Sequence, residues 1–155
     1  MIVIMLGADG AGKSTLARKI CSKIDLKYIK KNKPETQEEI NNMLQDYLDD
    51  ITGENIIYDR CIYCEYVYGN VMRNGSAVTL EDIATFEEKV KENGGGIIIH
   101  CTDETKKLWE RCNKRGEDYV TSYKQLDNIR NGYYQLLEHS TLPIIEYTVK
   151  DWIKE

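Results

Sequence analysis

The sequence predicts an α/β fold in which a five-stranded parallel sheet is covered by helices on both faces. First, short apolar runs alternate along the chain with longer segments of helical periodicity, the pattern of strand–helix–strand units. Second, the run Ile2–Leu6 is apolar at every position, as expected for a strand buried on both faces. Third, a glycine-rich segment joins that run to the first helical segment. The 155 residues suffice for one domain, 1–155, with a sizeable core.

The elements of the first half follow from these patterns. Apolar residues recur at helical spacing from Ser14 to Ile24, and Leu26–Ile29 is a short strand candidate. Proline favours the first turn of a helix, so one helix is expected from Pro34 to Ile51, ended by Gly53. Ile56–Tyr58 is expected to be the third strand.

The second half continues the same alternation. Four helical segments are expected, at Ile62–Met72, Leu80–Lys91, Glu104–Lys114 and Tyr123–Glu138. Two more strands are expected, at Ile97–Cys101 and Pro143–Tyr147. Strands that alternate with helices in this way form a parallel sheet, because each connection must cross back over the sheet.

Composition and charge narrow the possible partners. The net charge is −5, and the lysines and arginines are scattered, so no nucleic acid polymer is expected as a partner. No apolar run is long enough to span a membrane, and the first residues lack the basic region of a signal peptide, so a cytoplasmic protein is expected. The five cysteines are odd in number, which argues against a disulfide framework. Small phosphate-containing ligands fit these properties best.

The segment Gly7–Ser14 matches the pattern G-x-x-x-x-G-K-[ST] between a strand and a helix. Its glycines let successive backbone N–H groups turn inward around an anion, and the following helix adds its positive N-terminal end. Lys13 adds a charge near the β and γ phosphates, and Ser14 offers a hydroxyl to Mg²⁺. We therefore expect ATP and Mg²⁺ as cofactors, bound by Gly7, Asp9, Gly10, Ala11, Gly12, Lys13, Ser14 and Thr15.

A second group of polar residues, Asp59 and Arg60, follows the third strand. The carboxyl edge of a parallel sheet is where ligands bind. An aspartate there can hold Mg²⁺ through water, and an arginine can bind a second phosphate with two hydrogen bonds. A surface ion pair or a helix cap is the alternative interpretation of this Asp-Arg pair.

These segments resemble the thymidylate kinases. "GADGAGKST" looks like their Gly-x-Asp-Gly-x-Gly-Lys-Ser-Thr loop, and "DRCIYCEYVYG" resembles their Asp-Arg-Tyr-x-x-Ser-x-x-Ala-Tyr element. "IIIHCTDETKKLWERCNKRGED" is similar to their fourth strand, helix and lid, and "IRNGYYQLLEH" to the following helix. The resemblance implies a three-layer P-loop NTPase fold with a small lid. It also implies a Mg-ATP-dependent kinase of nucleotide biosynthesis that converts a deoxynucleoside monophosphate, such as dTMP, to the diphosphate.

The resemblance also implies roles for single residues. Asp9 would approach the 3′-hydroxyl of the acceptor and the metal shell, and Tyr68 would lie under its sugar. Arg60 would hold the acceptor phosphate, and Asp59 would organise Mg²⁺. Relatives of this kind are commonly dimers, so a homodimer is possible.

The lid, at about 111–122, would bring catalytic arginines over the transferred phosphate. Arg111 and Arg115 are the candidates, and Lys114 would assist them. A solvated helix face with acidic neighbours is the alternative interpretation of these three residues.

The sequence departs from the family between the second and third strands. The Arg-Glu-Pro-Gly stretch of the family is replaced by "KKNKPETQEE", and this region has neither an arginine nor a phenylalanine to read and stack on thymine. We therefore expect an acceptor base other than thymine, or one that is held loosely. Two other functions stay open: a deoxynucleoside kinase with Glu35, Glu38 or Glu39 as general base, and a non-catalytic ATP-binding adaptor.

Overall fold

The computed structural model describes residues 1–116 and 120–148. Its five strands form one sheet in the order β2-β3-β1-β4-β5, and every neighbouring pair is parallel. The strands are β1 (Ile2–Leu6), β2 (Lys27–Ile29), β3 (Ile56–Asp59), β4 (Gly96–Cys101) and β5 (Ile144–Tyr147). This confirms the predicted fold class, and each predicted strand lies within two residues of its observed bounds.

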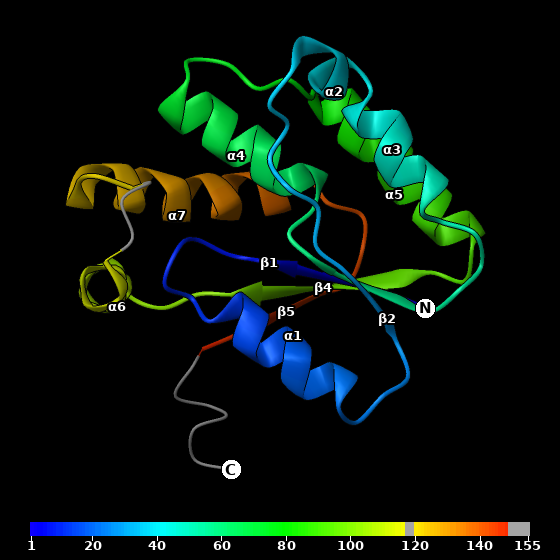
Figure 1. Cartoon of the computed structure of the whole chain (residues 1–155), viewed down its shortest axis with the longest axis horizontal. Coiled ribbons are helices and arrows are strands. Elements are labelled where there is room, and N and C mark those ends of the chain that lie inside the picture. The colour runs from blue at the N-terminus through cyan, green and yellow to red at the C-terminus, as the bar shows by residue number, and fades with distance from the viewer. Residues whose placement is uncertain (117–119, 149–155) are drawn as a thin grey trace.

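Helices cover both faces of the sheet, as predicted. Figure 1 shows α1 alone below the sheet and α3, α4, α5 and α7 above it, while α6 lies beside one edge. The helices of the described residues are α1 (Lys13–Cys21), α2 (Gln37–Asn41), α3 (Met43–Asp49), α4 (Ile62–Met72), α5 (Leu80–Glu92), α6 (Thr105–Arg115) and α7 (Tyr123–Leu137). In the part of the chain that the structure describes, none of the helices has the length and apolar character needed to cross a bilayer.

The prediction of one helix from Pro34 to Ile51 is wrong, because the segment forms two short helices. Thr36 caps α2, and its side-chain oxygen accepts a hydrogen bond from the N–H of Glu39 at 3.1 Å. At Asn42 the backbone turns to φ −95° and ψ 1°, so this residue ends α2 and begins α3. The apolar spacing continues across this break, which is why periodicity alone predicted a single helix.

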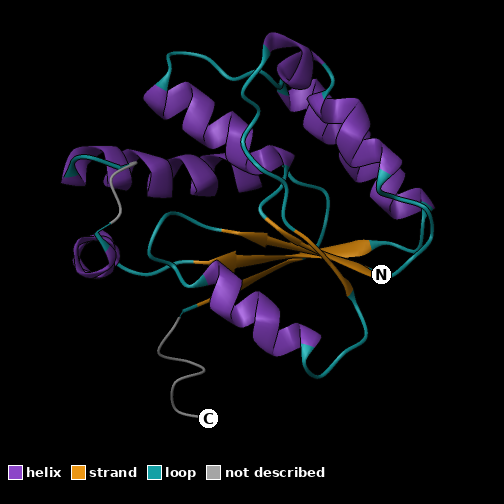
Figure 2. Cartoon of the chain, in the orientation of Figure 1, coloured by secondary structure: helices purple, strands orange, loops and turns teal. Residues whose placement is uncertain are grey.

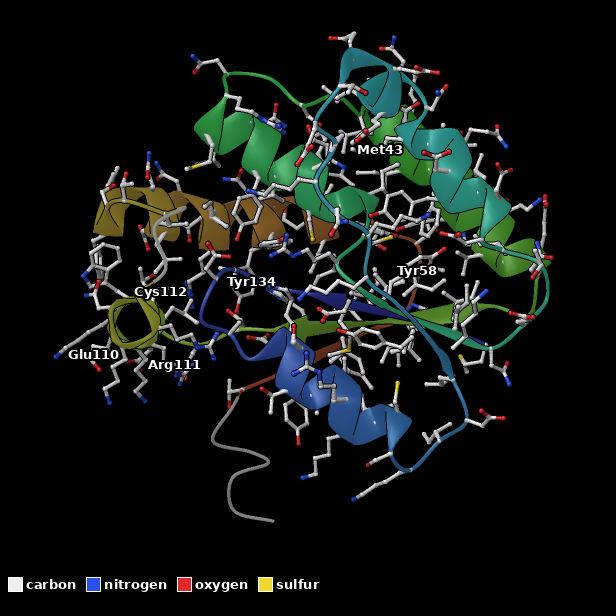
Figure 3. The ribbon with its side chains drawn as sticks, in the orientation of Figure 1. Met43, Tyr58, Glu110, Arg111, Cys112 and Tyr134 are labelled. Atoms are coloured by element: carbon white, nitrogen blue, oxygen red, sulfur yellow. The ribbon has the colours of Figure 1, made fainter. Side chains whose placement is uncertain are left out.

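The core lies on both sides of the central strand β1, whose five residues are all buried. Above the sheet, the rings of Tyr47, Tyr58, Tyr63 and Phe86 pack together with centroids 5.6 to 6.3 Å apart, and the three contacts with Phe86 are edge to face. Figure 3 shows Tyr58 just above the sheet, beneath α3. These contacts fix the helices above the sheet relative to the carboxyl edge of β3, where the candidate site begins.

The parallel register brings the ends of three strands together. Met5 of β1 is the partner of Asp59 at the end of β3, and Leu6 is the partner of His100 near the end of β4. The loops that follow β1 and β3 therefore leave the same edge of the sheet, which Figure 2 shows at the left-hand ends of the strands.

Candidate active site

The first residue of the loop after β1, Gly7, must be a glycine. A Cβ atom on Gly7 would lie 2.2 Å from the carbonyl oxygen of Cys101 at the end of β4, so any side chain would displace the sheet edge. Gly12 has φ +83° and ends the loop as the N-cap of α1. The Nζ of Lys13 donates a hydrogen bond of 2.7 Å to the carbonyl oxygen of Gly7, which places its ammonium group across the loop.

The same loop is a packing surface for α6. A Cβ atom on Gly10, whose φ is +82°, would lie 2.7 Å from the carbonyl oxygen of Leu108 on that helix. Arg111 donates through Nη1 to the carbonyl oxygen of Gly10 at 3.1 Å and through Nη2 to Oδ2 of Asp103 at 2.6 Å. Figure 3 shows Arg111 and Cys112 projecting from α6. The expected lid arginine Arg111 therefore lies against the loop, and an ion pair holds it there.

Asp103 is charged in this setting. Burial raises the pKa of its carboxyl group, but the hydrogen bonds from Arg111 and from the N–H of Glu104 outweigh that effect, so the pKa is lowered. A carboxylate in ion-pair contact with Arg111 stabilises the guanidinium beside the loop.

Asp59 lies at the centre of the site and is fully buried. Its Oδ2 accepts hydrogen bonds from Ser14 Oγ at 2.6 Å and from the hydroxyl of Tyr28 on β2. The Nζ of Lys30 lies 3.9 Å from the same oxygen. Burial, and then the bond to Asp59, raise the pKa of Tyr28 to about 12, so Tyr28 is a neutral donor at neutral pH.

The other carboxylate oxygen of Asp59 has no hydrogen-bond partner among the described residues, although it is buried. A buried carboxylate oxygen without a partner destabilises the fold unless a cation binds to it. Mg²⁺ is usually held by one or two protein oxygens together with phosphate oxygens and water. Asp59 and the adjacent hydroxyl of Ser14 therefore fit the predicted magnesium site.

Arg60 adopts a strained backbone conformation. Its φ is +80°, in the left-handed region that residues with a Cβ rarely occupy. Such strain persists only where the surrounding structure enforces it, and it concentrates at functional sites. This conformation of Arg60 lies in the turn between β3 and α4, and Arg60 lines the cavity described below.

Tyr68 and Asp9 meet across the cavity. The hydroxyl of Tyr68, on α4, donates a hydrogen bond of 2.9 Å to Oδ1 of Asp9 in the loop. Burial, and then the Asp9 carboxylate, raise the pKa of Tyr68 well above its usual value, so the hydroxyl stays protonated. This contact joins two residues that the sequence assigned to the sugar of the acceptor.

One cavity of about 670 Å³ brings these groups together. Most of the predicted site residues line it: Asp9, Gly10, Ala11, Gly12, Lys13, Ser14, Thr15, Arg60, Tyr68 and Arg115. Gly7, Asp59 and Arg111 do not line it but contact residues that do. The expected lid lies partly outside the described residues, because these omit 117–119.

Sequence reasoning missed several residues of the cavity wall. They include Lys30, Lys31, Met43, Glu65 and Arg73. The lysines follow β2, so the rule that placed Asp59 and Arg60 at the carboxyl edge also applied to them. Glu65 lies three residues before Tyr68, which is the spacing of one helix face.

The chain matches the model of one protein family, described as Polyphosphate kinase 2 (PPK2), over residues 1–132. Among curated proteins it is similar to the SPbeta prophage-derived uncharacterized protein YorR of Bacillus subtilis (strain 168). The two are 25% identical over 152 residues, which cover 97% of this chain and 90% of YorR.

Solved structures share the fold. The crystal structure of YorR in complex with phosphorylated GDP matches with a TM-score of 0.80 at 22% identity, over 98% of this chain and 88% of that one. Deoxyadenosine kinase from M. mycoides with bound dATP matches with a TM-score of 0.65 at 19% identity, over 97% and 92%. Polyphosphate kinase 2 from Arthrobacter aurescens TC1 matches with a TM-score of 0.76 at 17% identity, over 99% of this chain and 62% of that one.

Proposed function

Because the chain belongs to the polyphosphate kinase 2 family of P-loop kinases, we propose that it transfers the γ-phosphate of ATP to a deoxynucleoside monophosphate. The observation that carries the proposal is the single cavity in which the phosphate-binding loop, Arg60 and the Asp9–Tyr68 contact face one another. This arrangement provides separate places for a donor triphosphate and for an acceptor phosphate with its sugar.

The chain's own residues account for most of the chemistry. The backbone N–H groups of the loop and Lys13 hold the β and γ phosphates, and Arg60 holds the acceptor phosphate in line with them. Asp59 and Ser14 would hold Mg²⁺, which neutralises phosphate charge when bound. Arg111 beside the loop supplies positive charge near the transferred group, and Arg115 adds to it from the cavity wall.

The charges around the cavity favour a phosphate acceptor over a nucleoside hydroxyl. A hydroxyl acceptor benefits from a nearby carboxylate base, whereas the acceptor phosphate is already ionised near neutral pH. Glu35, Glu38 and Glu39 are all exposed, and only Glu39 lines the cavity. The group that follows β2 beside Asp59 is the ammonium of Lys30. A deoxynucleoside kinase is the second candidate, because deoxyadenosine kinase shares the fold.

The acceptor base and the phosphate donor each have two candidates. A dTMP-like acceptor agrees with the thymidylate kinase resemblance, but the guanine nucleotide in the YorR crystal supports a purine acceptor equally well. The family name raises polyphosphate as an alternative donor, and the lysines that line the cavity suit either donor.

One assay tests the proposal. ATP and polyphosphate are each combined with a panel of deoxynucleosides, their monophosphates and the ribose counterparts, and the products are separated by anion-exchange chromatography. We expect a diphosphate product from ATP and at least one monophosphate. Turnover with nucleosides alone would contradict the acceptor assignment, and turnover with polyphosphate alone would contradict the donor assignment. ATP binding without transfer to any acceptor would favour the adaptor function.

A further inference from the structure

One part of the cavity wall is an ion pair that the phosphate chemistry does not use. Arg73 donates through Nη2 to both carboxylate oxygens of Glu65. The backbone N–H of Ala77 donates to Oε1 of Glu65 at 3.1 Å. The side chain of Glu65 is only 10% exposed, while that of Arg73 is 44% exposed. A charged and largely buried carboxylate is therefore held in a fixed position in the wall.

The turn after α4 is built to reach this carboxylate. The N–H of Gly75 donates to the carbonyl oxygen of Gly69 at 2.9 Å. A Cβ atom on Gly69 would lie 2.7 Å from Cα of Ser76 and 3.1 Å from Oε1 of Glu65. Gly69 thus allows the turn to fold back onto α4, so Arg73 returns to a residue in the first turn of the helix.

The position of the pair suits the base of the acceptor. Arg60 precedes α4, and Glu65 and Tyr68 lie on the same face of that helix, lining the cavity. With the phosphate at Arg60 and the sugar at Tyr68, the base is directed toward the remaining wall. Met43 and Tyr47, each 8% exposed, line the same cavity and offer apolar side-chain atoms for contact with a base.

We propose that the acceptor base is guanine and that Glu65 and Arg73 read it. A carboxylate only accepts hydrogen bonds, and guanine presents two adjacent donors, N1–H and the 2-amino group. Because Glu65 already accepts from Arg73 and from the N–H of Ala77, Arg73 must release at least one of its oxygens as it turns toward the base. Its O6 and N7 are acceptors that suit an arginine. Adenine and cytosine each place an acceptor nitrogen beside their amino group, and thymine places two carbonyl oxygens around one N–H. Each of these would set a lone pair against the Glu65 carboxylate.

This inference rests on the proposed function, since it assumes that a nucleoside monophosphate occupies this cavity. Two measurements separate the two ideas. Direct binding of dGMP, dIMP, dAMP and dTMP to the wild-type protein is measured by isothermal titration calorimetry, which needs no turnover. Phosphoryl transfer to the same four nucleotides is measured with Mg-ATP. If dGMP binds best and none of the four is phosphorylated, the proposed function fails while the base assignment stands.

The wild-type protein should prefer dGMP to dAMP and dTMP by about 100-fold or more in kcat/KM, since two charge-assisted hydrogen bonds are at stake. dIMP keeps N1–H and O6 but lacks the 2-amino group, so it should be about tenfold weaker than dGMP. Equal kcat/KM values for dGMP and dIMP, or a higher value for dAMP or dTMP, would overturn the assignment. Both tests use the wild-type protein, so they do not depend on whether a variant folds.

The variant Glu65→Gln replaces one acceptor oxygen by a donor. It should narrow the ratio of kcat/KM for dGMP to kcat/KM for dAMP at least about tenfold. Glu81→Gln removes the same charge from an exposed residue of α5 outside the cavity and should leave the ratio unchanged. If Glu65 only braces the turn after α4, the variant will raise KM for all bases equally and the ratio will not move, which contradicts the proposal.

Discussion

Replacing Arg60 by glycine should stabilise the fold while removing most of the activity. Arg60 has φ +80°, a conformation that costs a residue with a Cβ roughly 1–2 kcal/mol. Glycine removes this strain but loses about 0.5–1 kcal/mol through the greater entropy of its unfolded state. The net gain is about 0.5–1 kcal/mol, which raises Tm by roughly 1–4 °C for a domain of this size.

The loss of activity follows from the chemistry of the guanidinium. Two charge-assisted hydrogen bonds to the acceptor phosphate contribute about 3–4 kcal/mol, so kcat/KM for the acceptor should fall by about 10²–10³. The affinity for ATP should change little, because the loop and Lys13 are intact. Arg60→Ala should lose the same activity without the gain in Tm, because alanine keeps the strained Cβ.

Scanning calorimetry gives Tm, and a coupled ADP-release assay gives kcat and KM. Asn74 has φ +62°, and asparagine tolerates this region, so Asn74→Gly is a matched control that should gain less stability than Arg60→Gly. A lower Tm for Arg60→Gly would refute the strain argument. An unchanged kcat/KM, or an effect on ATP binding alone, would show that Arg60 belongs to a different subsite.

Three further changes test the loop and the sheet edge. Lys13→Ala should abolish measurable transfer, because the γ-phosphate loses its positioning charge, and normal turnover would refute the mechanism. Gly10→Ala should lower the free energy of unfolding, measured by urea titration, by more than Gly53→Ala does. Both glycines have positive φ, but of the two only Gly10 has a backbone oxygen 2.7 Å from the added Cβ atom. Burial lowers the pKa of His100 to about 4, so the unfolded chain binds more protons and stability falls by roughly 3 kcal/mol as pH drops from 6.5 to 4. His100→Phe should flatten that part of the pH profile of urea unfolding, and an unchanged slope would assign the acid loss to other groups.

The sheet and the phosphate site were predictable because local sequence determines them. The apolar run Ile2–Leu6 and the glycine pattern after it are recognisable from the local sequence alone. The rule that ligands bind at the carboxyl edge of a parallel sheet correctly placed Asp59 beside the loop and Arg60 in the wall of the same cavity. The roles of these residues stay predictions. The break at Asn42 was not predictable, because the apolar spacing continues through it.

Contacts between distant segments were beyond sequence reasoning. Tyr28 contacts Asp59 only because β2 pairs with β3, and the apolar pattern of either strand does not predict the order of strands in the sheet. The pair of Glu65 and Arg73 depends on a turn that folds back over Gly69. Glu65 and Arg73, taken alone, are typical of a solvated surface, and only the fold places them in the cavity wall.

The distribution of charge in the cavity agrees with the ligands of the proposed reaction. Around the loop, Lys13, Lys30 and Arg60 face the place expected for the phosphates, although the chain as a whole carries a net charge of −5. At the wall expected for the base, the charge of Arg73 is balanced by Glu65. A cation-rich end concentrates field lines for an anionic group, whereas a balanced ion pair offers directed donors and acceptors to an uncharged ring. A polyanion without bases would gain nothing from the second end, so this wall favours a nucleotide as the acceptor.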